Sequence, residues 1–184
     1  MIDLLQNIEG SPALPLRYWS QDESRVGLKT ITRRILTALG IKPIGPVQWI
    51  FQSFYLYGAV EPLTGDSFFL EFSHLDADCF QIFLDQFSQA HPYSLNVIQL
   101  DNGRFHFAKK LQIPENVVLL FQPPYSPDIN PIERVWQFIK DQLRWLNLKN
   151  LDELRRKVDE VIQSITPNQI ASLTSFDFIL TALK

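Results

Sequence analysis

Three acidic residues from distant parts of the chain, Asp22, Asp101 and Glu133, could together carry out metal-dependent chemistry on phosphodiesters. Carboxylate oxygens bind hard cations such as Mg²⁺ or Mn²⁺. Two such cations about 3.5–4 Å apart can hold both the attacking and the leaving oxygen of the reaction. Three carboxylates brought together would repel one another without metal. Because the three residues are far apart in the sequence, this chemistry also depends on a fold that makes them converge.

Other kinds of metal site do not fit the residue types. Cys79 is the only cysteine, so it cannot form a disulfide within the chain, and we expect it in the core. The three histidines, at positions 74, 91 and 106, are too scattered for Cys/His zinc spacing. Any metal site must therefore be built from carboxylate oxygens.

Two of the acids have neighbours that allow a different interpretation. Asp22 and Glu23 are adjacent on an expected strand and point to opposite faces, so only one can join the site. The other then faces solvent or a loop. Asp101 begins the sequence DNG, which is typical of a turn, and the residues alone leave ligand and turn former both open.

Glu133 also has a structural alternative. Asn130, Pro131 and Glu133 occupy what would be the N-cap, N1 and N3 positions of a helix, so Glu133 could bond back to the backbone in a capping box. A carboxylate at a helix N-terminus is stabilised by about 0.3–1 kcal/mol, which also suits a metal ligand. Asp128 is the rival third acid, and we expect it to form a turn instead.

The first half of the chain predicts three strands. A first strand covers 16–23, and a long basic excursion over 24–46 follows it. Aromatic and β-branched residues predict a second strand over 48–60. The turn sequence PLTGD then leads into a third strand over 67–72, which closes a hairpin.

The second half alternates helices and strands. Apolar residues at three- and four-residue steps predict amphipathic helices, and short branched runs predict buried parallel strands. The predicted elements are a helix over 76–90, a strand over 95–100, a short helix over 104–111, a strand over 116–121, and helices over 131–146 and 151–165, with a further short helix after Pro167.

The resulting order, β-β-β-α-β-α-β-α, predicts an α/β fold with a mixed five-stranded sheet and helices on both faces. This order resembles the ribonuclease H fold. That fold takes its carboxylates from the first strand, the end of the fourth strand and a later helix, which here are the positions of Asp22, Asp101 and Glu133.

Three sequence motifs carry a more specific resemblance. They are WSQDES (19–24), VIQLDNGRFH (97–106) and QPPYSPDINPIERVW (122–136). With these motifs the chain resembles the DDE superfamily of transposases, in the bacterial insertion-sequence branch of the mariner superfamily. The resemblance covers about 17–146, and it implies that Asp22, Asp101 and Glu133 are the catalytic and metal-binding triad.

The resemblance implies a two-metal endonuclease that cleaves DNA strands and transfers them during transposition. The expected ligands are two Mg²⁺ or Mn²⁺ ions, terminal-repeat DNA and target DNA, with a homodimer assembled on the DNA. Such transposases begin with a helix-turn-helix domain, whereas only about 20 residues precede Asp22. We therefore expect a separately encoded or frameshift-fused helix-turn-helix half as partner. The interval from Asp101 to Glu133 is a few residues shorter than the family's, which suggests a trimmed helix after Asp101.

Several polar residues are candidate DNA contacts, each with a structural alternative. His106 could approach the scissile phosphate or be a hydrogen-bonded structural residue, and Asn102 could bind a phosphate or form the turn. Lys140 and Arg144 continue one polar face of the helix from Glu133 and could follow a phosphate backbone or only face solvent. Arg33 and Arg34 could clamp DNA from the basic excursion.

Composition agrees with a cytoplasmic globular protein. The sequence has no apolar run of membrane-spanning length and no signal-peptide pattern. The net charge of −3 argues against nucleic acid, but the charges are sorted along the chain. Residues 46–92 contain six acids and no Lys or Arg, whereas 102–157 contain ten basic residues against six acids, so a local phosphate-binding surface is possible.

We expect one catalytic domain over 17–147, preceded by an extension over 1–16 and followed by a helical extension over 148–184 packed on the same domain. Two alternatives to a transposase remain. One is a ribonuclease H-like nuclease acting on other nucleic acid. The other is an inactive remnant that serves as a dimerisation or DNA scaffold.

Overall fold

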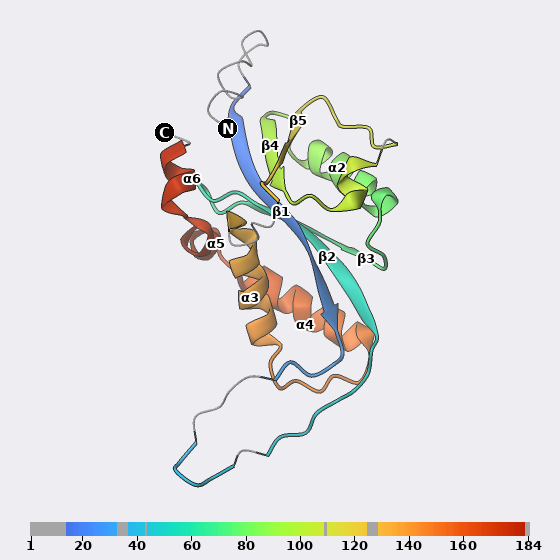
Figure 1. The fold of residues 1–184 in the computed structure, drawn as a ribbon, viewed down its shortest axis with the longest axis vertical. Helices are drawn as coiled ribbons and strands as arrows, with labels where there is room; N and C mark the ends of the chain where they lie inside the picture. Colours follow the sequence, from blue (N-terminus) through green and yellow to red (C-terminus); the bar gives the residue numbers. More distant parts are fainter. Residues whose placement is uncertain (1–13, 33–36, 43, 109, 125–128, 183–184) are drawn as a thin grey trace.

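A five-stranded mixed sheet forms the centre of the computed structural model, which describes residues 14–32, 37–42, 44–108, 110–124 and 129–182. The strand order is β3-β2-β1-β4-β5 (Figure 1). The middle strand β1 pairs antiparallel with β2 and parallel with β4, while β3 is antiparallel to β2 and β5 is parallel to β4. The strand bounds are Leu16–Gly27 for β1, Ser53–Val60 for β2, Ser67–Phe72 for β3, Leu95–Leu100 for β4 and Val117–Phe121 for β5.

Helix α2 (Ala77–Ala90) covers one face of the sheet. The Asp76 side chain caps its N-terminus by accepting bonds from the backbone N–H groups of Asp78 and Cys79. Its apolar stripe packs against β1, where Phe80, Phe83 and Phe87 share a cluster with Trp19. The short 3-10 helix η1 (Arg104–Phe107) lies on the same side, because Phe105 packs against this cluster.

The opposite face is covered by helices from the C-terminal half of the chain (Figure 1). Helix α3 buries Val135, Trp136 and Ile139 in a cluster that also contains Leu154 and Val158 of α4. These helices are α3 (Ile132–Gln142), α4 (Leu151–Ser164), α5 (Pro167–Thr174) and α6 (Asp177–Ala182). The predicted mixed sheet with helices on both faces is thus confirmed. No helix among the described residues is long and apolar enough to cross a membrane.

The described residues between β1 and β2, at 28–32, 37–42 and 44–52, extend away from the sheet (Figure 1). The prediction of a strand over 48–60 was wrong for 48–52, which precede β2. Their backbone accepts isolated bonds from Leu28 N–H at Gln52 O and from Thr30 N–H at Gln48 O, and Gln48 N–H donates to Oγ1 of Thr30. Trp49 and Phe51 remain 66% and 69% exposed. Strand β1 instead continues to Gly27, because Gly27 still pairs with Ser53.

Two helices end earlier than their apolar patterns predict. Helix α3 ends at Gln142 rather than near residue 146, and Trp145 adopts a left-handed backbone with φ of 59°. The predicted helix over 104–111 is only the four-residue turn η1. Helix α6 was not predicted, because its six residues are too few to show a periodic pattern.

Candidate active site

Asp22 lies in the middle of β1 and faces helix α3. Its Oδ2 accepts a hydrogen bond of 2.9 Å from Nε1 of Trp136, a core residue of α3. Burial raises the pKa of Asp22 to about 8, with further contributions from the negative charges of Glu23 and Glu133. The bond from Trp136 acts in the opposite direction. The ionised carboxylate is therefore short of positive charge in the protein alone.

Gly58 of β2 makes room for the tryptophan. It is paired with Asp22 across the strands, and a Cβ at this position would lie 2.6 Å from Cη2 of Trp136 and 2.8 Å from the ring of Phe69. A glycine inside a strand often marks such a close approach. The glycine in SFYLYGAV could therefore have indicated that a large side chain such as Trp136 packs against this strand. Trp136 was not among the site residues predicted from the sequence.

Asp101 directly follows β4, beside β1. The parallel pairing of β1 with β4 ends at Ser20 and Gln99, and Asp22 and Asp101 each follow these residues by two positions. Neighbouring strands lie about 4.8 Å apart. Tyr18 lies on the same face of β1 as Asp22, because alternate residues of a strand share a face. Tyr18 donates a hydrogen bond to Gln99 of β4, so Gln99 also lies on that face. The Asp101 side chain is 58% exposed.

Glu133 lies in the first turn of α3 and is exposed. Its charge contributes to the raised pKa of Asp22. Helix α3 lies on the sheet face of Asp22, because its Trp136 donates to that carboxylate. The capping-box alternative was wrong. Pro131 is the N-cap and makes no side-chain cap bond, while Asn130 is buried and donates from Nδ2 to the backbone oxygen of Gln21 at 2.9 Å. Asn130 thus fastens the start of α3 to β1, beside Asp22.

Glu23 does not face solvent or a loop, as we had expected for the acid outside the site. Its side chain is 6% exposed and lies on the α2 side of the sheet, where Oε1 is 3.3 Å from Nε2 of His106. Burial lowers the pKa of His106, but the hydrogen bond to the Glu23 carboxylate and the negative charges of Glu23 and Asp101 outweigh it and raise the pKa overall. Only 1% of the His106 side chain is exposed. Its surroundings are therefore those of a structural histidine, and its side chain offers no surface for contact with DNA.

The donor types at Asp22, Asp101 and Glu133 fit a hard divalent cation. All three offer carboxylate oxygens, and the raised pKa of Asp22 shows a buried carboxylate that a cation would stabilise in its ionised form. Within the described ranges, no three His, Cys, Asp or Glu side chains are grouped as a finished metal site. Asp101 and Glu133 are both exposed, so a metal ion could reach their carboxylates from solvent.

The remaining candidate DNA contacts have varied surroundings. Asn102 donates from Nδ2 to the backbone oxygen of Gln122 at 2.7 Å, which holds the loop after β4 against the end of β5. Arg144 forms an ion pair with Asp141. Arg33, Arg34 and the rival acid Asp128 lie outside the described residues.

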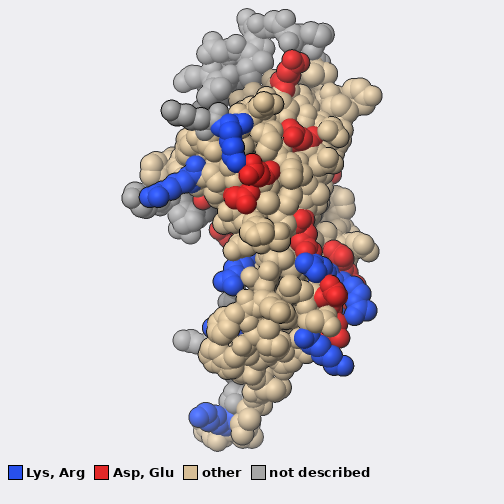
Figure 2. Space-filling view, turned by 90° about the vertical axis from the view of Figure 1, so that its right-hand side faces the viewer, with Lys and Arg blue, Asp and Glu red and all other residues tan. Residues whose placement is uncertain are grey.

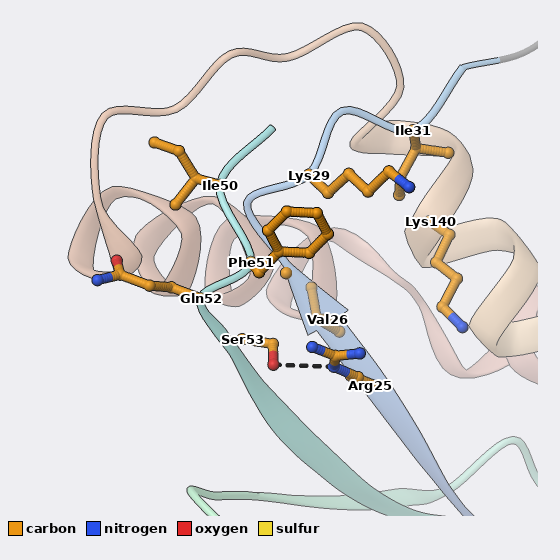
Figure 3. A pocket seen from close by; sticks show the side chains of 10 residues that line it. Arg25, Val26, Lys29, Ile31, Ile50, Phe51, Gln52, Ser53 and Lys140 are labelled. Carbon is orange, nitrogen blue, oxygen red and sulfur yellow. Dashed lines mark hydrogen bonds between the residues drawn. The ribbon is translucent and has the colours of Figure 1, made fainter. Parts of the chain in front are cut away.

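Lys140 lines a cationic pocket of about 370 Å³ at the end of β1 (Figure 3). Arg25 and Lys29 line it as well, together with Phe51, and none of its lining residues is acidic. Arg25 donates from Nε to Oγ of Ser53 at 2.9 Å, and Nζ of Lys29 lies 4.7 Å from the ring centre of Trp49. This local group contrasts with the face in Figure 2, where acidic and basic side chains are intermixed.

Comparison with known proteins gives the family. The family model described as DDE superfamily endonuclease matches residues 17–155. An uncharacterized protein of Sinorhizobium fredii (strain NBRC 101917 / NGR234), y4pE/y4sA, is 35% identical over 104 residues, which are 54% of this chain and 76% of that protein.

Solved structures agree at the level of the fold. The Mos1 mariner paired-end complex with Mn has a TM-score of 0.69 and 14% identity, covering 86% of this chain and 51% of that chain. The Mos1 paired-end complex with the left transposon end has a TM-score of 0.67 and 12% identity, covering 94% and 54%. The catalytic core domain of BIV integrase has a TM-score of 0.50 and 16% identity, covering 91% and 99%.

The chain thus spans about half the length of the Mos1 chains and nearly the whole integrase core. These likenesses confirm the ribonuclease H-like fold that the order of elements predicted. Because the family model covers most of its length, this chain belongs to the DDE superfamily of endonucleases.

Proposed function

We propose that this chain is the catalytic domain of a DDE transposase, which cuts DNA strands and joins them to target DNA with the help of divalent metal ions. The observation that carries the proposal is the position of Asp22, which bonds to Trp136 of the helix that carries Glu133 and lies on the strand that pairs with β4, directly before Asp101. The Mos1 structures of the same fold are complexes with a transposon end and with Mn or Mg, which supports DNA and divalent ions as ligands.

Asp22, Asp101 and Glu133 would hold two Mg²⁺ or Mn²⁺ ions. When bound, these ions supply Lewis acidity that activates the attacking oxygen and stabilises the leaving oxygen. Trp136 orients Asp22 through the bond to Oδ2, and Asn130 keeps the helix that carries Glu133 against β1. The reaction would first hydrolyse a strand at the end of the element, and the freed 3′ hydroxyl would then attack target DNA in line, without a covalent enzyme intermediate.

The cationic pocket supports a path for the DNA backbone away from the acids. Arg25 follows Asp22 by three residues on β1, which is about 10 Å along a strand. Lys140 follows Glu133 by seven residues on α3, which is about 10 Å along a helix. Arg25 and Lys140 both line this pocket. We propose that the pocket binds backbone phosphates, with Arg144 just after the end of α3 and Arg33 and Arg34 between β1 and β2 as additional contacts.

We further propose that the chain acts as a homodimer on DNA, with a separately encoded or frameshift-fused helix-turn-helix half that recognises the terminal repeats. Asn102 would hold the loop beside Asp101. These partners rest on the family and on the Mos1 likeness. Co-purification with the product of an overlapping upstream reading frame would test the second partner.

Strand cleavage tests the proposed function. We expect the protein, supplied with the helix-turn-helix half, to nick terminal-repeat DNA in Mg²⁺ or Mn²⁺, and we expect Asp22→Asn, Asp101→Asn and Glu133→Gln each to abolish nicking. Circular dichroism should show that the variants remain folded. A fully active Asp101→Asn protein would contradict the assignment, and preferential cleavage of an RNA/DNA hybrid would favour a ribonuclease H-like nuclease instead.

A further inference from the structure

Behind Asp22, on the α2 side of the sheet, lies a buried acid that the proposed chemistry does not use. Glu23 accepts a hydrogen bond of 2.7 Å from Nε2 of Gln21 at its Oε1. The same oxygen lies 3.3 Å from Nε2 of His106. A buried carboxylate is costly unless it is paired, so this arrangement needs a function or a strong structural reason.

His106 connects Glu23 to Asp101. Its ring packs against Phe80 and Phe105, with ring centres 4.5 and 4.1 Å away. Its Nδ1 lies 3.0 Å from Oδ1 of Asp101 and 3.2 Å from the backbone oxygen of Asp101. The imidazole is therefore fixed by aromatic packing on its sides and by a carboxylate at each nitrogen.

One oxygen of Asp101 is held while the other remains available. Oδ1 accepts a bond of 2.7 Å from the backbone N–H of Gly103 in addition to its contact with His106. No hydrogen bond to Oδ2 comes from any of the described residues. A Cβ at position 103 would lie 3.0 Å from Oδ1 of Asp101 and 3.2 Å from Nδ1 of His106, so an added methyl group would press on both.

We propose that Glu23 and His106 are positioning residues, which fix Oδ1 of Asp101 from behind the sheet so that Oδ2 is presented to the metal ion. This role rests on the proposed function, because it requires Asp101 to be a metal ligand. An exposed aspartate would otherwise lose side-chain freedom on binding metal, whereas a side chain held in advance does not. Partners that orient metal ligands in this way typically change metal affinity by about 10–100-fold when they are removed.

Two amide substitutions of His106 separate positioning from packing. In His106→Asn the side-chain amide nitrogen occupies the place of Nδ1 and can still donate to Asp101. In His106→Gln the amide nitrogen occupies the place of Nε2 and can reach Glu23 but not Asp101. Both variants lose ring packing, so both should be less stable. Only His106→Gln should lose the hold on Asp101.

We would measure Mn²⁺ binding to the full chain by electron paramagnetic resonance titration, with the unfolding midpoint of each sample. We expect His106→Gln to bind Mn²⁺ about 10–100-fold more weakly than wild type. The Mn²⁺ affinity of His106→Asn should be close to that of wild type. Glu23→Gln should give an intermediate loss. His91→Gln is the matched control, because His91 packs on Trp19 and Phe87 beyond the end of α2 and should affect stability alone.

Equal Mn²⁺ affinity in the two His106 variants, whether unchanged or equally weakened, would overturn the positioning role. If neither variant folds, Gly103→Ala replaces them, since its Cβ presses on the Asp101–His106 contact. Unchanged Mn²⁺ affinity in folded Gly103→Ala would also overturn the role. Failure of wild type to bind Mn²⁺, or wild-type affinity in Asp101→Asn, would instead overturn the proposed metal site itself.

Discussion

Nε1 of Trp136 donates a hydrogen bond to Oδ2 of Asp22, so one side chain belongs both to the hydrophobic core and to the proposed metal site. Its ring is 2% exposed and packs edge-on against Phe69, with ring centres 5.7 Å apart. The orientation of Asp22 is therefore coupled to the packing of helix α3 on the sheet.

Trp136→Phe keeps an aromatic ring in the core but removes the donor. We expect the free energy of unfolding to fall by about 1–3 kcal/mol, because a largely buried carboxyl oxygen loses its partner. Urea denaturation at neutral pH without metal would measure the loss. Trp49→Phe is the control, since Trp49 is 66% exposed and its substitution should change stability by less than about 0.5 kcal/mol. A similar loss in both variants would count against the coupling.

Gly58→Ala should disturb the same contact from the opposite strand. Its added methyl group would meet the rings of Trp136 and Phe69, and forced overpacking of this kind costs about 1–3 kcal/mol. The loss should be smaller in a Trp136→Phe background, because the ring end nearest to Gly58 is then absent. A double-mutant cycle measures this difference, and simple addition of the two losses would mean that the contact is not responsible.

The raised pKa of Asp22 predicts that stability depends on pH in metal-free protein. The carboxyl group has a pKa of about 8 in the folded state and an ordinary value of 3.8, so between these values the folded state binds more protons. Stability should then fall as pH rises from about 4 to 8. Asp22→Asn should reduce this slope and be more stable than wild type at pH 8, by on the order of a few kcal/mol. Thermal unfolding across this range would show it, and a less stable Asp22→Asn at pH 8 would refute it.

Metal binding should restore the stability that the folded protein loses when Asp22 ionises. Mg²⁺ or Mn²⁺ at about 100 times its dissociation constant should stabilise wild type by about 2.7 kcal/mol. Binding should release protons near pH 7, because Asp22 must ionise. Calorimetry in buffers of different ionisation enthalpy would count the protons. Asp22→Asn should release fewer protons and gain less stability, whereas an equal response would place the ion elsewhere.

The cationic pocket gives a prediction for DNA binding. Lys140→Ala and Lys29→Ala should weaken binding about equally for different DNA sequences, and each should lower the slope of log affinity against log salt by about 1 if it removes a phosphate contact. Lys157→Ala on α4 is a suitable control, because Lys157 already pairs with Glu160. Fluorescence anisotropy at several salt concentrations would compare them, and equal slopes in all variants would exclude the pocket as a phosphate site.

The sequence predicted the sheet well, because patterns of alternating or continuous apolar residues are local. The strands at Ser67–Phe72 and Leu95–Leu100 have the bounds that those patterns indicated. The strand predicted over 48–52 was wrong. Aromatic residues favour strands, but a strand forms only where a neighbouring strand completes the ladder of backbone hydrogen bonds. Nothing near those residues in the chain reveals that β1 ends at Gly27 and leaves them with isolated bonds.

The site was predictable only in part. The motifs located Asp22, Asp101 and Glu133, but whether a neighbouring polar side chain touches them depends on distant packing. Glu23 and His106 are 83 positions apart. Asn130 suited a helix cap by its type and spacing, yet it bonds to Gln21 of β1 instead. Such contacts follow from the docking of α3 and η1 on the sheet, which no local pattern records.

The back-to-back arrangement of Asp22 and Glu23 makes the register of β1 part of the chemistry. A slip of this strand by one residue would exchange its two faces. Glu23 would then stand opposite α3, and Asp22 would stand near His106. Such a protein would keep every acid of the three motifs, but with a longer carboxylate arm on one side and a shorter one on the other. A single-codon deletion early in β1 could therefore silence the enzyme while leaving each of its signature residues in the gene.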